Sequence, residues 1–243
     1  QAVSIDENGK RFCNEYYATS EQRGLATVYR SRKTKFAVVD DNFTLYRQYT
    51  IPQHAGFSAT EENIAALRES LDKAYAKFKG TYEEPEEAEG EGGPGGGGPM
   101  TSVEFIADDT LEGLAAQLGL TREAAETFLK TIENYNAYCE AGADQEFGRN
   151  AEVLFPVNQS PYYACTFDPV LGETMVTCGG IITDGEQNAL DANFEPIPGL
   201  YVSGNDCGRR FGYEYITPIP GCSLGMAIVL GRECGKSVGT FLG

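Results

Sequence analysis

Positive charge is scarce in this sequence. Its 243 residues contain 19 Lys and Arg against 36 Asp and Glu, which gives a formal net charge of −17. A field of this sign repels phosphate backbones and anionic membrane surfaces, so we expect no nucleic acid among its partners. A small anionic substrate would need a local group of cations, and Arg209 with Arg210 is the candidate group late in the chain.

Patterns for metal binding and membrane spanning are also lacking. The seven cysteines are widely spread and contain no C-x-x-C pair, so nothing indicates zinc or an iron–sulfur cluster. No run of about 18 apolar residues occurs, so we expect no transmembrane segment. No signal peptide opens the chain, which begins at Gln1 and enters strand-like sequence at once. We therefore expect the natural protein to extend further in the N-terminal direction.

The first eighty residues predict short strands followed by a helix. Residues 2–5 and 7–12 read as a hairpin joined at Asn8-Gly9, where both turn residues would take positive φ. Residues 35–39 are a further strand candidate. A capping pair, Ser58 with Glu61, begins a helix of apolar period 3.6 that ends near Gly80.

A Glu-, Pro- and Gly-rich stretch separates this part from the rest. Residues 81–100 cannot bury enough apolar area to offset the entropy of ordering, so we interpret them as a linker or surface loop. A phosphate-binding glycine loop is disfavoured, because no strand precedes the glycines and no Lys-Ser/Thr follows them.

Two helices and a series of short strands follow the linker. Asp109 with Glu112 caps a helix that stops at Gly119, and Thr121 caps a second helix that stops at Gly142, which predicts a helix pair. Strands are expected at residues 162–167, 180–183 and 200–203, and a Gly-rich helix begins near Ser223.

The end of the last strand and the start of the last helix are the most informative pieces for chemistry. Residues 199–206 form an apolar strand that ends in a Gly turn, and residues 220–225 open a helix. Unpaired N–H groups at a helix start can stabilise an electron-rich group such as the edge of a reduced flavin, and glycines permit close approach. A Gly-rich helix packed tightly against a sheet explains the same pattern equally well.

Ordered motifs along the chain resemble one family. The hairpin Gly9-Lys10-Arg11-Phe12 with Asn14-Glu15 is similar to the start of the substrate-capping domain of flavocytochrome c type fumarate reductases and their relatives. Further similar motifs follow in the same order, at residues 109–115, 135–136, 141–144, 147–149, 161–164, 177–180, 197–201 and 231–235. The chain therefore resembles the C-terminal part of an FAD-dependent fumarate reductase/succinate dehydrogenase type flavoprotein, and residues 20–100 match least.

This resemblance implies FAD, held mainly by an N-terminal G-x-G-x-x-G unit that we expect this chain to lack. The cofactor-binding residues it implies are Gly204 and Asn205 near the ribityl and phosphate portion, and Gly221, Cys222, Ser223 and Leu224 at the isoalloxazine edge. Asn205 stands where many relatives carry Glu, which keeps a hydrogen-bonding side chain and removes a charge. We expect the chain alone to bind FAD poorly.

The fold class that follows is α+β with a discontinuous FAD-binding domain. Residues 1–11 would be a remnant of that domain, residues 12–158 the substrate-capping domain, and residues 159–243 the C-terminal portion of a Rossmann-like FAD-binding domain without its N-terminal βαβ unit.

Departures from the family's substrate-binding pattern disfavour fumarate. Thr19 occupies the place of the family's proton-donating Arg, and Arg23 is the nearest substitute. Val176 replaces a substrate-binding His, and Thr217-Pro218 replaces an Asn-Arg pair. The chain's single histidine, His54, lies in the weakly matching stretch and is interpreted as structural or exposed.

Aromatic residues stand where the charged groups are missing. Tyr213 and Tyr215 are candidate proton donors, with Arg23 as a third catalytic candidate, and Thr177, Arg209 and Arg210 are candidate substrate-binding residues. Packing of the loop explains either tyrosine almost as well. We expect part of an oxidoreductase that reduces or forms a C=C bond activated by a carbonyl or carboxylate, with a redox protein as possible electron donor. A non-catalytic fragment or partner subunit is the alternative, and a plain binding module is a third.

Overall fold

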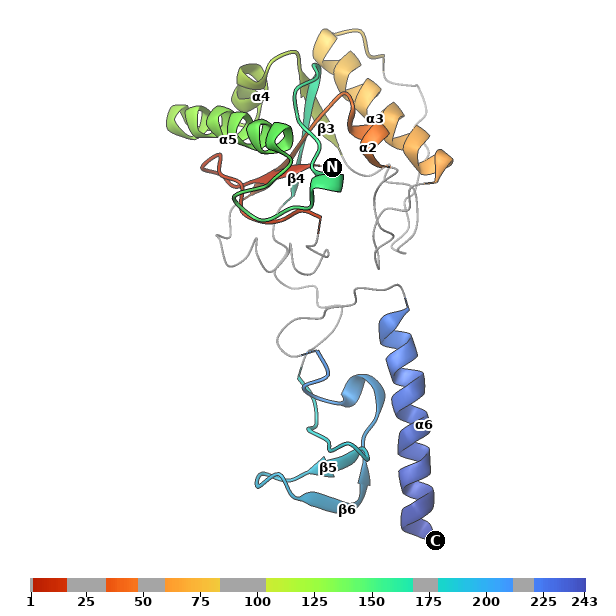
Figure 1. Cartoon of the computed structure of the whole chain (residues 1–243). Helices are drawn as coiled ribbons and strands as arrows, with labels where there is room; N and C mark the ends of the chain where they lie inside the picture. Colours follow the sequence, from red (N-terminus) through yellow and green to blue (C-terminus); the bar gives the residue numbers. More distant parts are fainter. Residues whose placement is uncertain (1, 17–33, 48–59, 84–103, 168–178, 212–220) are drawn as a thin grey trace. The chain divides into compact units, whose positions relative to one another are not determined.

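The chain divides into two compact units, Gln1–Val170 and Leu171–Gly243. The computed structural model describes residues 2–16, 34–47, 60–83, 104–167, 179–211 and 221–243. Its mixture of helices and strands agrees with the predicted α+β class (Figure 1). The functional domain boundaries and the Rossmann-like character of the C-terminal part stay predictions.

The first unit is built on a four-stranded antiparallel sheet. Its strands run in the order β1 (Val3–Ile5), β2 (Lys35–Asp40), β4 (Tyr162–Phe167) and β3 (Phe105–Asp108). The β2 and β4 strands predicted from sequence are thus confirmed, and β3 was missed. Strand β1 pairs with β2 in a register that sets Val3 against Val38, so the N-terminal residues share one sheet with the rest of this unit.

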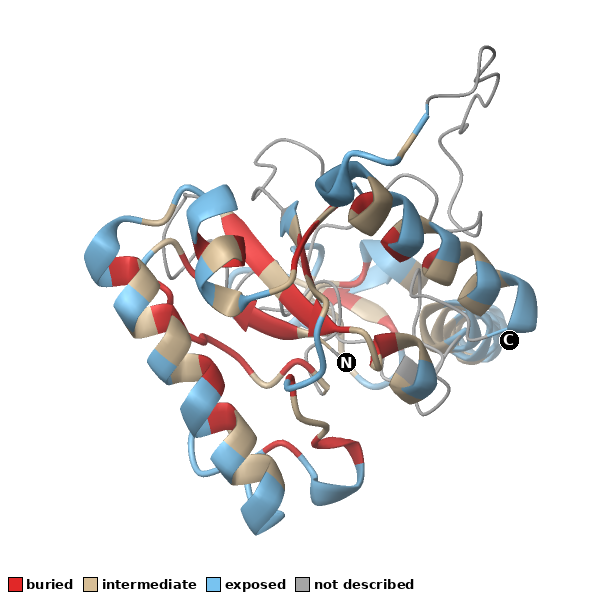
Figure 2. Ribbon diagram, turned by 90° about the horizontal axis from the view of Figure 1, so that it is seen from above, coloured by how far each residue is buried: buried red, intermediate tan, exposed pale blue. Residues whose placement is uncertain are grey.

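Helices cover both faces of this sheet, and side-chain alternation explains why. Tyr163 and Ala164 are neighbours on β4 that point to opposite faces, and each is fully buried in a different apolar cluster. Ala164 packs with helices α4 (Leu111–Gln117) and α5 (Arg122–Ala141), whereas Tyr163 packs with α2 (Phe43–Arg47) and α3 (Glu61–Lys79). Figure 2 shows the buried residues along the strands and on the inner faces of these helices.

The helix ends agree closely with the sequence, but two of the predicted caps were wrong. Helix α3 begins after Thr60, whose hydroxyl accepts from the N–H of Asn63, and Ser58 lies outside the described residues. Helix α4 is capped by Thr110, because the carboxylate of Asp109 instead binds the Tyr75 hydroxyl and Lys79. The Thr121 cap of α5 is confirmed. So are the left-handed C-caps Gly80 and Gly142.

The N-terminal hairpin is present with a shorter second arm than predicted. Residues beyond Gly9 make a single antiparallel bridge, Ile5 to Arg11, and no strand. Gly9 has φ +76, but Asn8 is not among the residues with positive φ. The turn is closed instead by the carboxylate of Asp6, which accepts from the N–H groups of Asn8 and Lys10.

The second unit contains a short hairpin, a 3-10 turn and one long helix. Strand β5 (Asn188–Leu190) pairs with β6 (Pro196–Tyr201), η2 (Gly204–Asp206) follows, and α6 (Cys222–Leu242) ends the unit. The strand predicted at 200–203 is therefore placed too late. The strand predicted at 180–183 is reduced to isolated bridges at Ile181 and Thr183. Another 3-10 turn, η1 (Ala151–Val153), lies in the first unit.

Candidate functional site

The residues that could hold a ligand gather where β6 ends in the second unit. After Tyr201 the chain remains extended through Ser203 and then turns at Gly204, whose φ of +72 is readily taken by glycine. Cys207 is buried beneath this turn, and its thiol donates to the carbonyl oxygen of Val202 (3.1 Å). The turn thereby presents Asn205 and Asp206, both exposed, at its outer side.

Two glycines bring a second loop against this turn. The N–H of Ile181 donates to the carbonyl oxygen of Asp206 (2.9 Å), and the N–H of Gly208 donates to the carbonyl oxygen of Ile181 (2.8 Å). A Cβ on Gly180 would lie 2.4 Å from the Asp206 carbonyl oxygen, and one on Gly208 would lie 2.5 Å from the Gly180 carbonyl oxygen. The approach of backbone to backbone therefore requires glycine at both positions.

Helix α6 begins without a capping side chain within the described part of the chain. Its N-cap is Gly221, with φ +79, and the first turn carries no acidic residue. The carbonyl oxygen of Gly221 accepts from the N–H of Gly225 (2.8 Å), so the N–H groups of the first turn point outward from the helix end. This start matches the helix predicted near Ser223 to within one residue.

Arg210 joins the turn at η2 to the start of α6. One guanidinium nitrogen donates to Asn205 Oδ1 (2.9 Å), and the other donates to the carbonyl oxygen (2.9 Å) and the Oγ (3.1 Å) of Ser223. The guanidinium also lies over the ring of Phe211, 4.8 Å from its centroid. Two residues predicted to contact the cofactor are thus held together by one predicted to bind substrate.

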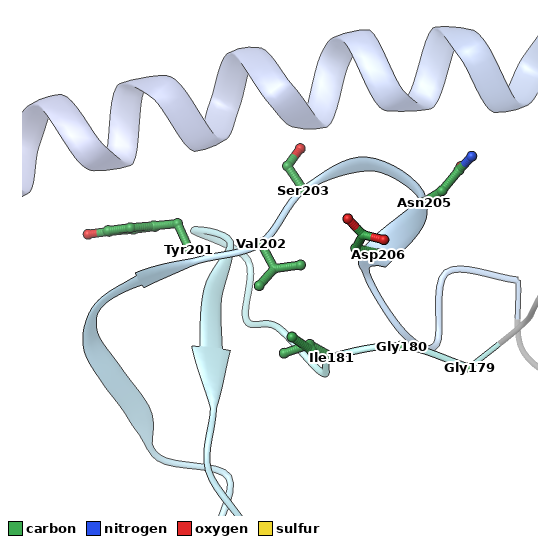
Figure 3. Close-up of a pocket in the computed structure, with 8 residues that line it drawn as sticks. All are labelled: Gly179, Gly180, Ile181, Tyr201, Val202, Ser203, Asn205 and Asp206. Carbon is green, nitrogen blue, oxygen red and sulfur yellow. The ribbon is translucent and has the colours of Figure 1, made fainter.

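A cavity of about 560 Å³ opens at this place. Its walls come from the loop at Gly179–Ile181 and from the end of β6 with η2, and the residues that line it are Gly179, Gly180, Ile181, Tyr201, Val202, Ser203, Asn205 and Asp206 (Figure 3). The hydroxyl of Ser203 is buried and has no hydrogen-bond partner among the described residues. Figure 3 shows this hydroxyl turned toward the helix that runs past the cavity.

The other predicted site residues either have contacts away from the cavity or lie outside the residues that the structure describes. Arg209 is exposed and lies over the ring of Phe194 (5.3 Å), so the two neighbouring arginines have different partners. Cys222 contacts Met226, and Leu224 is 68% exposed. Arg23, Thr177, Tyr213 and Tyr215 lie outside the described residues, so their roles stay predictions.

Of the eight residues that line the cavity, only Asn205 was a predicted site residue, and seven were missed: Gly179, Gly180, Ile181, Tyr201, Val202, Ser203 and Asp206. The signal for Gly180 is the Gly179-Gly180 pair directly before the apolar residues Ile181 and Ile182. Ser203 and Asp206 flank the predicted Gly204-Asn205 pair, so a wider window around that pair would have included them.

The first unit contains a buried cluster of charges that serves the fold. The guanidinium of Arg11 pairs with Glu15 (2.8 Å) and Asp144 (2.9 Å), and Arg149 donates to the Tyr135 hydroxyl (2.9 Å). Burial alone would raise the pKa of Asp144, but hydrogen bonds from Arg11 and from the backbone N–H groups of Arg149 and Glu146 outweigh it and lower the pKa to about 2. Four motifs from the sequence comparison meet in this cluster.

Neither a metal site nor a membrane span is found in the described parts of the chain. No group of three or more His, Cys, Asp or Glu side chains there could hold a metal ion. Among the helices described, none is both long and apolar enough to cross a bilayer.

Comparison with known families identifies the family of the chain. A family model described as FAD binding domain matches residues 2–224, which spans both compact units. The chain belongs to the FAD binding domain family. This membership confirms the resemblance to fumarate reductase-like flavoproteins and indicates FAD as the cofactor.

Two curated relatives match the chain over about half of its length. It is 35% identical over 128 residues to a vinyl phenol reductase of Lactiplantibacillus plantarum, covering 53% of this chain and 25% of the relative. It is 34% identical over 129 residues to a probable fumarate reductase of Shewanella frigidimarina, covering 53% and 20%. The matches therefore span a quarter or less of the length of these relatives.

A solved structure has a similar fold. The 3-ketosteroid Δ1-dehydrogenase of Sterolibacterium denitrificans, solved in complex with 1,4-androstadiene-3,17-dione, matches with a TM-score of 0.61 and 24% identity. The match covers 98% of this chain and 38% of that protein. At this level of identity the similarity establishes the fold alone.

The residues present at the cavity fit a flavin nucleotide. Gly179 and Gly180 let backbone N–H and carbonyl groups line its wall, and the buried Ser203 hydroxyl has unused hydrogen-bonding capacity within the described residues. A flat ring or a phosphate ester can approach such a wall closely because no Cβ intervenes.

Proposed function

We propose that this chain is part of an FAD-dependent oxidoreductase that reduces, or forms, a C=C bond activated by a neighbouring unsaturated or carbonyl group. The observation that carries the proposal is that one FAD-binding family model, over residues 2–224, reaches into both units. The candidate cofactor residue Asn205 lines the cavity, and Arg210 connects it to the candidate Ser223. FAD would supply hydride transfer, and the protein would supply orientation and a proton donor.

Gly204, Asn205 and Ser203 would line the cofactor on one side, and the first turn of α6 at Gly221–Leu224 would lie at the edge of its ring. The unpaired N–H groups and the partial positive charge at the N-terminus of α6 would stabilise an electron-rich edge of the flavin ring. The Arg210 guanidinium adds positive charge beside Ser223. These features support binding of a group that gains electron density when reduced.

The substrate we propose is a small unsaturated molecule less charged than fumarate. The net charge of −17 disfavours a dicarboxylate. One relative, a vinyl phenol reductase, is named for a substrate without a carboxylate. Arg23, Tyr213 and Tyr215 are the proposed proton donors, and Thr177 with Arg209 the proposed substrate contacts.

A further polypeptide segment is part of this proposal. Helix α6 has no buried residue, and Leu224, Ile228, Val229, Phe241 and Leu242 on it are each more than half exposed. Apolar area of this extent on one unit favours a covering partner. We propose that the partner is a nucleotide-binding FAD segment, in the same polypeptide or in a separate chain.

The test is flavin binding and turnover with and without that segment. The chain would be combined with a segment carrying the nucleotide-binding unit of a relative, and the visible flavin spectrum and substrate-dependent flavin oxidation would be recorded. The proposal expects both signals in the combination. Flavin binding without any oxidation by vinyl phenols, enones or unsaturated acids would favour the non-catalytic alternative, which the exposed face of α6 also supports.

A further inference from the structure

The hydrogen bonds of Arg210 fix which atoms Asn205 and Ser223 can offer to a ligand. A guanidinium carries donors and no acceptor, so Asn205 must face it with its carbonyl oxygen Oδ1, at 2.9 Å. The amide NH₂ of Asn205 is then turned away from Arg210 as a donor. Because Arg210 also donates to Ser223 Oγ, at 3.1 Å, the hydroxyl hydrogen of Ser223 is likewise left to donate outward.

Arg210 connects two elements of the second unit. Asn205 lies in η2 and Ser223 in the first turn of α6, and both contacts come from one planar group stacked on Phe211. A planar fork loses little rotamer freedom per hydrogen bond, so it is a stiff connection. A Lys at this position would have a single ammonium group to donate to both Asn205 and Ser223, so its connection would be weaker.

We propose that Arg210 is a positioning residue of the cofactor site. It holds η2 against the start of α6 and sets the Asn205 amide and the Ser223 hydroxyl as donors toward hydrogen-bond-accepting atoms of the flavin nucleotide. A Glu at position 205 would instead present acceptors and select hydroxyl groups. This inference rests on the proposed function for its ligand, whereas the connection between η2 and α6 does not depend on flavin.

Hydrogen exchange on the 243-residue chain without flavin tests the connection. Arg210→Met removes the donors and keeps an apolar stem over Phe211. We expect amide exchange at Cys207 and Gly225, whose N–H groups bond within η2 and within the first turn of α6, to rise about tenfold, and Arg210→Lys to give a smaller rise. Arg209→Met is the matched control, because Arg209 contacts Phe194 instead, and it should leave these amides unchanged. Equal exchange in Arg210→Met and wild type would overturn the connection.

A double-mutant cycle on FAD affinity tests the role toward the ligand. In the chain combined with a nucleotide-binding segment, flavin fluorescence quenching would give the FAD dissociation constant for Asn205→Ala, Arg210→Met and the double variant. We expect each single change to weaken binding about tenfold and the double variant to be little weaker than either, since Arg210 acts through Asn205.

The exchange experiment and the double-mutant cycle together distinguish failure of this inference from failure of the proposed function on which it rests. Additive losses in the cycle, or an unchanged dissociation constant in Arg210→Met, contradict the positioning role while leaving the FAD-binding function intact. A wild-type combination that binds no FAD contradicts the proposed function and the ligand assigned here, and the exchange experiment still decides whether Arg210 joins η2 to α6.

Discussion

The two compact units of this chain differ sharply in how much apolar surface they bury. The first unit has two apolar clusters, one on each face of its sheet, with Leu67, Leu71, Leu114 and Phe128 fully buried. In the described part of the second unit the buried apolar residues are Ala189 and Cys207 alone. The first unit therefore holds its own core, and the second exposes the residues that should form one.

This difference in buried apolar area indicates that the two units are stabilised in different ways. Burial of apolar area is the main favourable term in folding, and a helix gains most of its stability from packing one face. Helix α6 has 21 residues and no buried one, whereas the 20-residue α5 buries Ala124, Phe128, Ile132 and Tyr135. We infer that α6 is stabilised by a partner segment and α5 by its own unit.

The largest effect is expected from the buried charges of the first unit. Asp144→Asn leaves the fully buried Arg11 with one anion fewer, and an uncompensated buried charge costs about 3–5 kcal/mol of unfolding free energy. Urea unfolding followed by circular dichroism measures this loss. Glu146→Gln is the matched control, because its carboxylate is 43% exposed and 4.0 Å from Arg11. Equal losses for both variants would show that the cluster does not stabilise this unit.

Gly9→Ala tests the tight packing of the first unit. An added Cβ would lie 2.2 Å from the Ala124 carbonyl oxygen and 2.6 Å from the Phe128 nitrogen, at a φ of +76. We expect a loss of about 2–4 kcal/mol from overpacking and backbone strain together. Gly142→Ala has a similar φ of +64 with nothing within 4 Å, so it should lose about 1 kcal/mol. The two variants unfolding at the same urea concentration would rule out the overpacking.

Gly180→Ala makes the corresponding test in the second unit. Its Cβ would collide with the Asp206 carbonyl oxygen, whereas Gly179→Ala meets nothing within 4 Å. We expect Gly180→Ala to break the bonds of the Ile181 and Gly208 N–H groups at a cost of about 1–3 kcal/mol, seen as faster amide exchange at both residues. The account of the cavity wall fails if Gly179→Ala exchanges as fast.

The smallest effect expected is the pH dependence of the first unit. The pKa of Asp144 is lowered from 3.8 to about 2 in the folded chain, so its contribution to stability is complete above about pH 4 and is lost as the pH falls toward 2. The unfolding free energy of wild type should therefore fall more steeply in this interval than that of Asp144→Asn. Parallel pH profiles would contradict the lowered pKa.

Much of the first unit could be predicted from sequence because local signals there agree with its packing. Apolar residues at helical spacing predict α5, and Thr121 and Gly142 mark its N-terminal and C-terminal ends. The cap of α4 was placed one residue early because Asp109 is used in contacts with Tyr75 and Lys79, which lie far away in sequence. Strand β3 was missed because it has only four residues, which lie between the end of the Gly-rich stretch and the start of α4.

The site was predicted only in part, for a physical reason. The family resemblance implied Gly204, Asn205 and Ser223 as cofactor residues, and they lie at a strand end and a helix start, which have local signatures. The hydrogen bonds from Arg210 to Asn205 and Ser223 have no such signature, since they depend on how η2 and the start of α6 lie in the folded unit. The same holds for the glycine contact between residues 180 and 208, which only the folded backbone brings together.

The most direct test of this account is hydrogen exchange across α6 in the chain alone and after combination with a nucleotide-binding segment and FAD. The account predicts that residues 226–242 exchange faster than α5 in the chain alone. In the combination they should become strongly protected, with one bound flavin per chain, while α5 exchanges slowly in both. Unchanged exchange in α6 on addition of the segment and FAD would contradict the claim that this unit completes an FAD site.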